Sequence, residues 1–337
     1  MGEIASFEVL NGKQVLVTGG LGFIGSNLAE ALCGLGARVT VLDSLDPFCG
    51  GNETNIVAFR EDVTWLRGDV RDADAMRRAV VGKDLIINCA AHTSHPGSMK
   101  DPRYNLQTNC LGVLNLLEAL REENAGTRFV QIGTSTQIGH MRHPIIDETH
   151  EEFPLDVYSA NKMAAEKHTL LYHAAFGIPT TVVRLSNVFG PRASICSSDF
   201  GFINFFVGLG LMGKPLTIYG EGEQTRDVLY VRDAVSAILA ASVAERALGE
   251  VYFAVSHTTT SVKEIATAIA DTVGGSVVSI PWPAERKAIE IGDARISNDK
   301  IAAHLGWSPT HTNLREGLAE TRDYYLQYLD DYLKGQG

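Results

Sequence analysis

Hydrophobic residues in the first half of the chain form short, nearly continuous runs that alternate with stretches of helical period. After the run 15–17, apolar residues at Ile24, Leu28 and Leu32 recur every four residues and predict a helix. The alternation continues, so further elements are predicted as strands at 38–43, 63–66, 84–91, 128–134 and 180–185 and as helices through 109–118 and from about residue 158. Strands separated by helices predict an α/β protein with a doubly wound parallel sheet.

The pattern changes after residue 190, where a loop-like stretch precedes a strongly apolar segment. Residues 202–211 predict a helix, and residues 216–219 predict a short strand that ends in a Gly-x-Gly turn. Because 337 residues exceed the usual size of one core, we expect two lobes, 1–185 and a smaller C-terminal α+β lobe at 186–337. Parts of 227–255 are expected to return to the first lobe.

Four glycines follow the first predicted strand and open the first predicted helix. They can be aligned as Gly19-x-x-Gly22-x-x-Gly25 or, with Gly20 first, as the general dinucleotide-binding pattern of a Rossmann-type fold. Glycine lets the backbone approach a ligand closely, and the N–H groups of a helix N-terminus suit a pyrophosphate. Asp43 ends the second strand, 18 residues beyond Gly25. Its carboxylate can bind both ribose hydroxyls and would repel a 2′-phosphate, which predicts NAD rather than NADP; the alternative is a local cap.

Two further segments carry residues suited to acid–base chemistry. Tyr158 and Lys162 are four residues apart and therefore share one face of a helix. A nearby ammonium is expected to lower the pKa of the phenol toward the working range, and the lysine can also hold a ribose. Thr134 ends the fifth predicted strand, where open α/β sheets bind ligands, and its hydroxyl can orient a substrate alcohol. Taken singly, such pairs and hydroxyls are more often surface pairs and caps.

Composition excludes several other classes of protein. The net charge of −11 argues against nucleic acid or an anionic membrane as a partner, and no apolar run is long enough to cross a bilayer. Five cysteines without a CxxC pair favour reduced thiols and a cytoplasmic location. Four histidines lie near candidate pocket loops, but their spacing marks no metal site, and we interpret them as structural or solvent-facing: His92, His95, His140 and His143.

These motifs, in this order, resemble the extended short-chain dehydrogenases/reductases, and specifically the NAD-dependent nucleotide-sugar epimerases and dehydratases, UDP-glucose 4-epimerases among them. The resemblance extends from about residue 12 to residue 325. It rests on these segments: TGGLGFIG at 18–25, GDV at 68–70, AA at 90–91, Asn109 with Gly112, RLSNVFGPR at 184–192, IYGEG at 218–222, QTRD at 224–227 and LGW at 305–307.

The resemblance implies roles for individual residues. Thr134, Tyr158 and Lys162 would be the catalytic residues. Substrate would be bound by Asn187 and Arg226 at the diphosphate and by Tyr219 beside the base; the alternative for Tyr219 is a core aromatic. The residues that would bind NAD are Gly19, Gly22, Phe23, Ile24, Gly25, Asp43, Asp69, Val70, Ala90, Ala91, Asn109, Tyr158, Lys162 and Ser186. A homodimer is also implied, formed by the helices near 109–121 and 158–176, with Leu111, Leu114 and Leu117 fitting either that interface or packing on the sheet.

The residues after Thr134 indicate which reaction of the family to expect. In the family pattern, sugar 4,6-dehydratases have Thr-Asp-Glu at this point and UDP-glucuronate decarboxylases have Thr-Ser-Glu. This chain instead has Ser135 and Thr136 after Thr134. Without a carboxylate for elimination, we expect a UDP-sugar 4-epimerase that acts on glucose/galactose, N-acetyl or uronic forms through a transient 4-keto sugar. The alternatives are a C2 or C3 epimerase, a 4-ketoreductase or a catalytically silent NAD-binding regulator.

Two segments depart from the family pattern. Gln137-Ile138-Gly139 replaces the usual Val-Tyr-Gly and is expected to alter one pocket wall. Glu290 stands where the family's Arg-x-Gly-Asp has arginine, so a phosphate-binding side chain is missing, and Arg286 or Lys287 are the candidates to replace it. We expect this departure to affect the choice of nucleotide more than the hydride chemistry.

Overall fold

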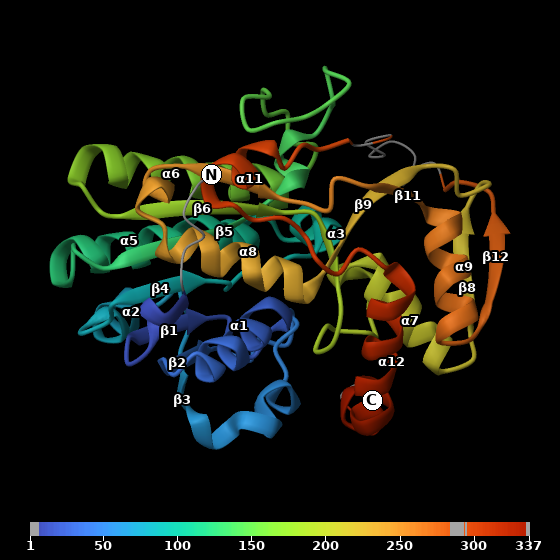
Figure 1. The fold of residues 1–337 in the computed structure, drawn as a ribbon, viewed down its shortest axis with the longest axis horizontal. Helices are drawn as coiled ribbons and strands as arrows, with labels where there is room; N and C mark the ends of the chain where they lie inside the picture. Colours follow the sequence, from blue (N-terminus) through green and yellow to red (C-terminus); the bar gives the residue numbers. More distant parts are fainter. Residues whose placement is uncertain (1–6, 284–292, 294, 335–337) are drawn as a thin grey trace.

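A parallel sheet of seven strands forms the centre of the protein (Figure 1). The computed structural model describes residues 7–283, 293 and 295–334. The sheet has the order β10-β6-β5-β4-β1-β2-β3, and every neighbouring pair is parallel. This confirms the predicted doubly wound α/β fold. Its strands are β1 (Gln14–Thr18), β2 (Arg38–Asp43), β3 (Val63–Arg67), β4 (Leu85–Asn88), β5 (Arg128–Thr134), β6 (Thr180–Leu185) and β10 (Val251–Ala254).

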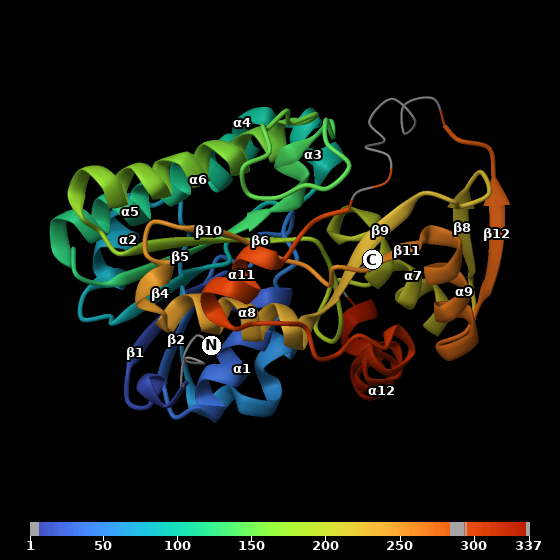
Figure 2. The ribbon, with the colours of Figure 1, turned by 45° about the horizontal axis from the view of Figure 1, so that its top comes forward.

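Helices cover both faces of this sheet, as Figure 2 shows. The helices on one face are α2 (Ala73–Val80), α5 (Gly112–Glu123) and α6 (Val157–Phe176). Those on the other face are α1 (Phe23–Gly34), α8 (Val231–Val243) and α11 (Asp299–Leu305). Along β1, Val15 and Val17 pack into the core on the α1 side, whereas Leu16 packs into the core on the α5 side. The nearly continuous apolar runs of the sequence follow from this burial on both faces.

A smaller lobe packs beside the carboxyl ends of the central strands. It contains a three-stranded sheet of order β11-β9-β7 and a parallel pair β12-β8. Helices α7, α9 and α12 pack against one another. The bounds are β7 (Asn187–Phe189), α7 (Phe202–Leu211), β8 (Pro215–Tyr219), β9 (Thr225–Tyr230), β11 (Thr259–Ser261), α9 (Val262–Thr272), β12 (Ser276–Ile280) and α12 (Leu314–Leu333).

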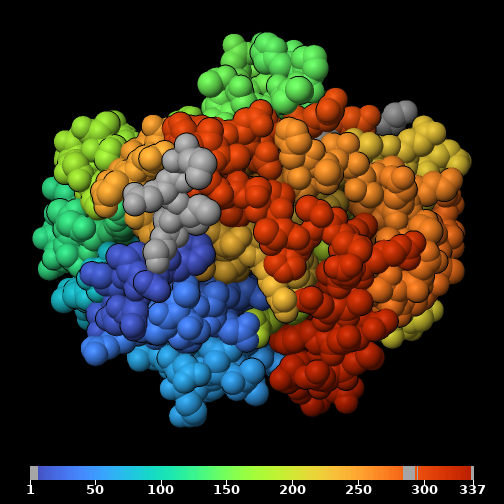
Figure 3. Space-filling model, in the orientation of Figure 1, coloured from blue at the N-terminus to red at the C-terminus, as the bar shows by residue number. Residues whose placement is uncertain are grey.

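Short helices connect these elements. They are η1 (Phe7–Leu10), η2 (Glu53–Asp62), α3 (His95–Lys100), α4 (Pro102–Leu106), the π-turn η3 (Gln107–Leu111), η4 (Ser135–Ile138), η5 (Ser198–Phe200) and η6 (Glu245–Ala247). The loop between η4 and α6, green in Figure 3, stands out from the rest of the surface. Among the described residues, none of the helices combines the length and the apolar character needed to cross a membrane.

The observed elements differ from the predicted ones in a few places. The strand expected over 84–91 ends at Asn88, because the chain turns there and Cys89, Ala90 and Ala91 line a pocket instead. The helix expected from residue 109 begins within the π-turn before α5. Helix α8 packs on the sheet, and β10 pairs with β6 at its edge. The division into lobes at residue 186 stays a prediction.

Candidate active site

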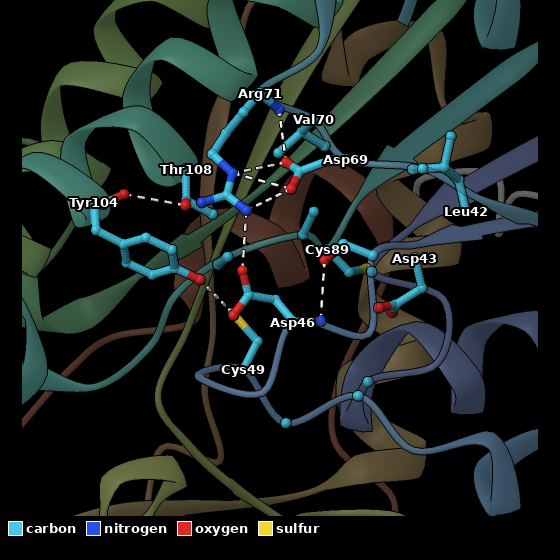
Figure 4. Close-up of a pocket in the computed structure, with 18 residues that line it drawn as sticks. Leu42, Asp43, Asp46, Cys49, Asp69, Val70, Arg71, Cys89, Tyr104 and Thr108 are labelled. Carbon is cyan, nitrogen blue, oxygen red and sulfur yellow. Dashed lines mark hydrogen bonds and ion pairs between the residues drawn. The ribbon is translucent and has the colours of Figure 1, made fainter. Parts of the chain in front are cut away.

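The carboxyl ends of the parallel strands meet at one edge of the sheet, and a cavity of about 940 Å³ opens there toward the smaller lobe. The sheet contributes the glycine turn after β1, the end of β5 and the residues after β6. The smaller lobe contributes residues of α7, β8 and β9. A second, smaller pocket adjoins the cavity at the same glycine turn and follows the ends of β2, β3 and β4 (Figure 4).

The glycine turn is packed too tightly for any larger residue at two of its positions. Gly19 has a φ of +64°, and a β-carbon there would lie 2.7 Å from the backbone nitrogen of Ala90. A β-carbon at Gly25 would lie 2.2 Å from the carbonyl oxygen of Gly19. Gly22 is the N-cap of α1 and supplies no side chain to cap it. Backbone N–H groups at the start of α1 thus face a cavity that Gly22, Phe23 and Ile24 line, and this arrangement fits a pyrophosphate.

Gly20 is required for a different reason, which decides between the two alignments of the motif. A β-carbon there would lie 2.6 Å from the side chain of Val41 on the neighbouring strand β2. Gly20 therefore allows the turn to pack against the sheet, while Gly19, Gly22 and Gly25 surround the helix N-terminus. The geometry favours the spacing that starts at Gly19.

Asp43 performs the local role that sequence analysis kept as an alternative, and it also lines the pocket. Its Oδ2 accepts the Leu21 N–H at 3.0 Å and its Oδ1 accepts the Leu45 N–H at 2.9 Å. Burial raises the pKa of this carboxyl, and the two N–H donors oppose that shift. Each carboxylate oxygen has a further lone pair, so the caps leave acceptor capacity for ribose hydroxyls.

Arg71, which sequence analysis did not single out, organises the neighbouring pocket. Its guanidinium lies between two carboxylates, 2.5 Å from Asp69 and 2.9 Å from Asp46, and 4.9 Å from the centre of the Tyr104 ring (Figure 4). Burial raises the pKa of Asp69, but the hydrogen bonds from Arg71 outweigh burial and hold it below its usual value. Asp43 lines the same pocket, so three carboxylates and one guanidinium face this space, an environment that disfavours a 2′-phosphate.

Thr134, Tyr158 and Lys162 come together at the end of β5 and the start of α6. All three residues line the large cavity. Burial raises the pKa of Tyr158 to about 12, although the nearby Thr134 side chain lowers it. The expectation that Lys162 would bring this pKa down is therefore wrong for this structure, because burial of the phenol outweighs the favourable contacts.

Lys162 is itself buried, and its ammonium donates to the carbonyl oxygen of Ile132. Burial lowers the pKa of Lys162 to about 8, while the nearby Cys89 and Glu166 act in the opposite direction. The lysine thus loses its proton far more readily than an ordinary lysine. Lys162 and Tyr158 lie one turn apart on α6 and line the same cavity, so a readily titrated ammonium and a phenol are both available there for acid–base chemistry.

A buried row of polar side chains connects the glycine turn to this lysine. Thr18, Asn88 and Gln131 are direct register partners on β1, β4 and β5. The Thr18 hydroxyl donates to Asn88 at 2.5 Å, Asn88 donates to Gln131 at 2.8 Å, and Gln131 donates to the Ile132 carbonyl at 2.9 Å. That carbonyl also accepts Lys162. The row places Lys162 at a fixed position relative to the end of β1.

Asn109 lines neither cavity and instead supports the loop after β4. Its Oδ1 accepts the His92 N–H at 2.9 Å, and its Nδ2 donates to the His92 carbonyl at 2.9 Å. That loop carries Ala90 and Ala91, which line the smaller pocket with Val70. Asn109 would therefore contribute to a dinucleotide site indirectly, by holding the loop that carries Ala90 and Ala91.

The residues expected to bind substrate all face the large cavity, together with Ser186. Asn187 donates to the Asp227 carbonyl at 3.0 Å, and the Ser186 hydroxyl donates to the Asp227 carboxylate at 2.6 Å. The ring of Tyr219 lies 5.2 Å from that of Trp282, tilted by 42°. Arg226 lines the same space. Trp282 was missed in the sequence, because nothing local marks a tryptophan that meets its partner across two paired strands, β8 and β12.

Gln137 does not form a pocket wall, contrary to expectation. Its side chain is buried behind the cavity and donates to Glu166 at 2.9 Å and to Glu152 at 3.1 Å. Glu166 is in turn paired with the buried Arg184 of β6 at 2.6 Å. The departure from the family pattern at this position thus changes what supports η4. The departure at Glu290, and the candidates Arg286 and Lys287, lie outside the described residues.

The histidines have separate surroundings. His92 is buried and 2.9 Å from Asn105, whereas His140 and His143 are exposed. His95, interpreted from the sequence as structural or solvent-facing, lies in the wall of the large cavity. Within the part of the chain that the structure describes, no group of three His, Cys, Asp or Glu residues is placed to hold a metal ion.

Comparisons with known proteins agree with this arrangement. Residues 15–253 match the model of the NAD dependent epimerase/dehydratase family. The chain is 32% identical over 321 residues to the dTDP-glucose 4,6-dehydratase of Streptomyces griseus, with 94% of each chain covered. It is 30% identical over 321 residues to the UDP-glucose 4-epimerase of Mycolicibacterium smegmatis, covering 93% of this chain and 98% of the relative.

A solved structure extends the likeness to the whole fold. The UDP-glucose 4-epimerase of Thermotoga maritima, solved with UDP-glucose, superimposes with a TM-score of 0.84 at 27% identity, covering 94% of this chain and 99% of the other. The glycine turn, the pocket at Asp43 and the Tyr158–Lys162 pair are each suited to a dinucleotide. The chain therefore belongs to the NAD-dependent epimerase/dehydratase family, and it is an enzyme with NAD as its cofactor.

Proposed function

We propose that the protein is a UDP-sugar 4-epimerase that inverts C4 through a transient 4-keto sugar. The observation that carries the proposal is the end of β5, where Thr134 lines the cavity with Tyr158 and is followed by Ser135 and Thr136. A hydroxyl and a phenol serve alcohol oxidation and re-reduction, whereas elimination needs a further acid and base. The likeness to epimerases of Mycolicibacterium smegmatis and Thermotoga maritima supports it.

The hydroxyl groups that follow Thr134 are engaged with one another. Thr136 Oγ1 lies 3.1 Å from Thr134 Oγ1 and accepts the Ser159 hydroxyl at 3.0 Å. These contacts hold the Thr134 hydroxyl in position beside Tyr158. Ser135 and Thr136 stand where the pattern of the 4,6-dehydratases has Asp-Glu. The absence of carboxylates at these two positions favours the epimerase reaction over the dehydratase reaction of the Streptomyces griseus relative.

In the mechanism that we propose, Tyr158 first loses its own proton to solvent, and the resulting phenolate takes the proton of the C4 hydroxyl, which Thr134 orients. NAD bound at the glycine turn would supply the reversible hydride acceptor. The keto sugar then turns about its diphosphate linkage and presents the other face of its C4 ketone. After that face has been reduced, Tyr158 returns the proton to the C4 oxygen. Lys162, whose pKa of about 8 leaves its ammonium largely charged at neutral pH, favours that phenolate by its positive charge.

The smaller lobe would bind the nucleotide diphosphate. Arg226 offers a planar fork of donors for phosphate oxygens, and Asn187 an amide beside it. The tilted Tyr219–Trp282 pair supplies aromatic surface for a base. The sugar would then lie between these groups and Tyr158, inside the same cavity.

The proposal is tested by incubating the purified protein with a panel of nucleotide sugars without added NAD and separating the epimers. The panel contains UDP-glucose, UDP-galactose, UDP-N-acetylglucosamine, UDP-glucuronate and dTDP-glucose. Conversion between C4 epimers without added cofactor supports the epimerase. Inversion at C2 or C3 would indicate another epimerase, and formation of a keto sugar with stoichiometric consumption of oxidised NAD would indicate a 4-ketoreductase running in reverse. No conversion at all would indicate a 4-ketoreductase or a silent NAD-binding regulator.

We further propose a cytoplasmic homodimer in which α5 and α6 of two copies pack together. Leu111, Leu171 and Phe176 of this region are exposed, which suits an interface, whereas Leu117 is buried in the core against the sheet. All five cysteines are free thiols, in keeping with a reducing compartment. Light scattering that showed only monomer at micromolar concentration would contradict the dimer.

A further inference from the structure

His95 and Asp156 form a hydrogen-bonded pair in the wall of the large cavity, beside Tyr158. Nδ1 of His95 lies 2.6 Å from Oδ2 of Asp156. The rings of His95 and Tyr158 meet edge to face, with their centres 4.8 Å apart. Both members of the pair line the cavity together with Thr134. A second acid–base pair thus stands next to the phenol that we propose takes the C4 proton.

The backbone holds this pair in place. The Ser98 hydroxyl accepts the Tyr158 N–H at 3.0 Å and donates to the His95 carbonyl at 2.7 Å. The first turn of α6 is therefore fastened to α3, the short helix that His95 begins. These two bonds hold the backbone of His95 at a fixed position relative to the backbone of Tyr158.

Helix capping alone does not account for the histidine. Asp156 caps α6 through Oδ1, which accepts the Ser159 N–H at 2.8 Å, and it holds His95 through the other oxygen. The side chain of His95 keeps 36% of its accessible surface, and that surface belongs to the cavity wall. It is therefore open to a molecule bound beside Tyr158.

The pairing also decides which nitrogen of the imidazole acts as a base. An ionised carboxylate only accepts hydrogen bonds, so Nδ1 carries the hydrogen and Nε2 keeps its lone pair. Burial raises the pKa of Asp156, but the hydrogen bond and charge of His95 outweigh burial and hold it below its usual value. The carboxylate therefore stays ionised and stabilises the imidazolium that forms when Nε2 takes a proton.

We propose that His95 is a further catalytic residue, which moves a proton to and from a carbon adjacent to the transient ketone, and that Asp156 positions it. A ketone at C4 acidifies the hydrogens on C3 and C5. Nε2 takes one of these protons, and the C–H electron pair becomes the double bond of an enolate whose charge rests on the C4 oxygen. The imidazolium then returns a proton to the same carbon, which restores the ketone.

This step rests on the proposed function, because the ketone exists only after C4 has been oxidised. It extends that function, since a simple C4 epimerase exchanges no carbon-bound hydrogen with water. The substrate class is a nucleotide hexose with a hydrogen on C3 or C5. The His95–Asp156 pair also gives the cavity an acid–base group, which Ser135 and Thr136 do not provide.

Solvent deuterium tests the proposal. The enzyme is incubated in D₂O with the five nucleotide sugars of the panel, and both the products and the recovered substrates are analysed by mass spectrometry and proton NMR. We expect one deuterium at C3 or C5, and we expect His95→Asn, whose amide can still donate to Asp156, to lower the labelling rate about 100-fold or more relative to C4 inversion. Asp156→Asn, which keeps the helix cap, should lower labelling as well.

The ratio of labelling to inversion separates a catalytic from a structural role, because a general distortion would lower both rates together. His140→Asn, an exposed histidine outside the cavity wall, is the control and should keep both rates. C4 inversion without label would overturn the proposal and leave the epimerase standing, as would label that survives in His95→Asn. Label accompanied by loss of water would support His95 and replace the epimerase by a dehydratase. Absence of label from every product and every recovered substrate would overturn the proposal whether or not epimers form.

Discussion

The two sides of the active-site cavity are built in different ways. On the sheet side, the backbone at Gly19 and Gly25 is in such close contact that no β-carbon fits, and Thr134, Tyr158 and Lys162 are buried. On the side of the smaller lobe, Tyr219 and Trp282 are only half-buried and come from separate strands or their ends. The sheet side is therefore fixed before any ligand binds, whereas the other side can adjust. Changes to the first should affect cofactor and chemistry, and changes to the second should affect substrate affinity.

The largest effect is expected for Gly25→Val. Its side chain would overlap the Gly19 carbonyl, which a β-carbon already approaches to 2.2 Å, so the turn cannot keep its shape. The variant should be purified without NAD, as measured by the cofactor released on denaturation, and should melt at a lower temperature. Gly34→Ala is the matched control, because nothing lies within 4 Å of a β-carbon there. Normal NAD content in Gly25→Val would contradict the rigid sheet side.

Tyr158→Phe should lower turnover about 100- to 10,000-fold while the NAD content of the purified protein stays normal. The phenylalanine fills the same buried space but has no hydroxyl to exchange a proton with the sugar. Epimer separation measures turnover, and cofactor release measures NAD. Tyr172→Phe, at another buried tyrosine of α6 that hydrogen-bonds Glu118, should leave turnover unchanged. If both variants lost activity equally, the role of Tyr158 would be structural.

The buried lysine predicts how stability depends on pH. The folded chain holds the pKa of Lys162 at about 8, below the value of an unfolded lysine. Between pH 8 and 10 the unfolded chain therefore binds more protons at this lysine, and the contribution of Lys162 to the free energy of unfolding should rise with pH by up to about 1.4 kcal/mol per unit. Burial also raises the pKa of Cys33, Cys49, Cys89 and Tyr158, so these groups keep protons that the unfolded chain loses and lower the free energy of unfolding at alkaline pH. The contribution of Lys162 is therefore measured as a difference from a variant that lacks the lysine.

Urea denaturation of the wild type and of Lys162→Met at several pH values between 7.5 and 10 measures this dependence. The methionine is similar in length and cannot titrate, so the free energy of unfolding of the wild type relative to the variant should rise over this range. Parallel curves for the two proteins would mean that Lys162 keeps an ordinary pKa when folded.

The smallest effect is expected on the adjustable side. Trp282→Leu should raise the KM for the nucleotide sugar about 2- to 10-fold with little change in kcat, because one ring of the tilted pair is lost while chemistry and NAD are untouched. Trp282→Phe, which keeps an aromatic ring, should recover part of the affinity. A fall in kcat instead of a rise in KM would show that the smaller-lobe side of the cavity also affects the chemical step.

The same contrast explains what the sequence alone could predict. The glycine turn, Asp43 and the Tyr158–Lys162 spacing are local patterns, and each element that carries them was predicted near its observed bounds. Arg71, Trp282 and the His95–Asp156 pair were missed, because their partners lie on other elements and only the fold brings them together. The pKa of Tyr158 was predicted in the wrong direction, since spacing along a helix says nothing about how deeply a phenol is buried.

The row formed by Thr18, Asn88 and Gln131 also bears on how the sheet finds its alignment. Apolar side chains on both faces of a buried sheet discriminate weakly between alternative pairings, because one valine fits much like another. These three side chains satisfy each other only when β1, β4 and β5 pair in the observed register, and a shift of one residue would bury unpaired polar groups. The row can therefore act as a check on strand alignment during folding, so that a chain that pairs its central strands correctly also places its lysine.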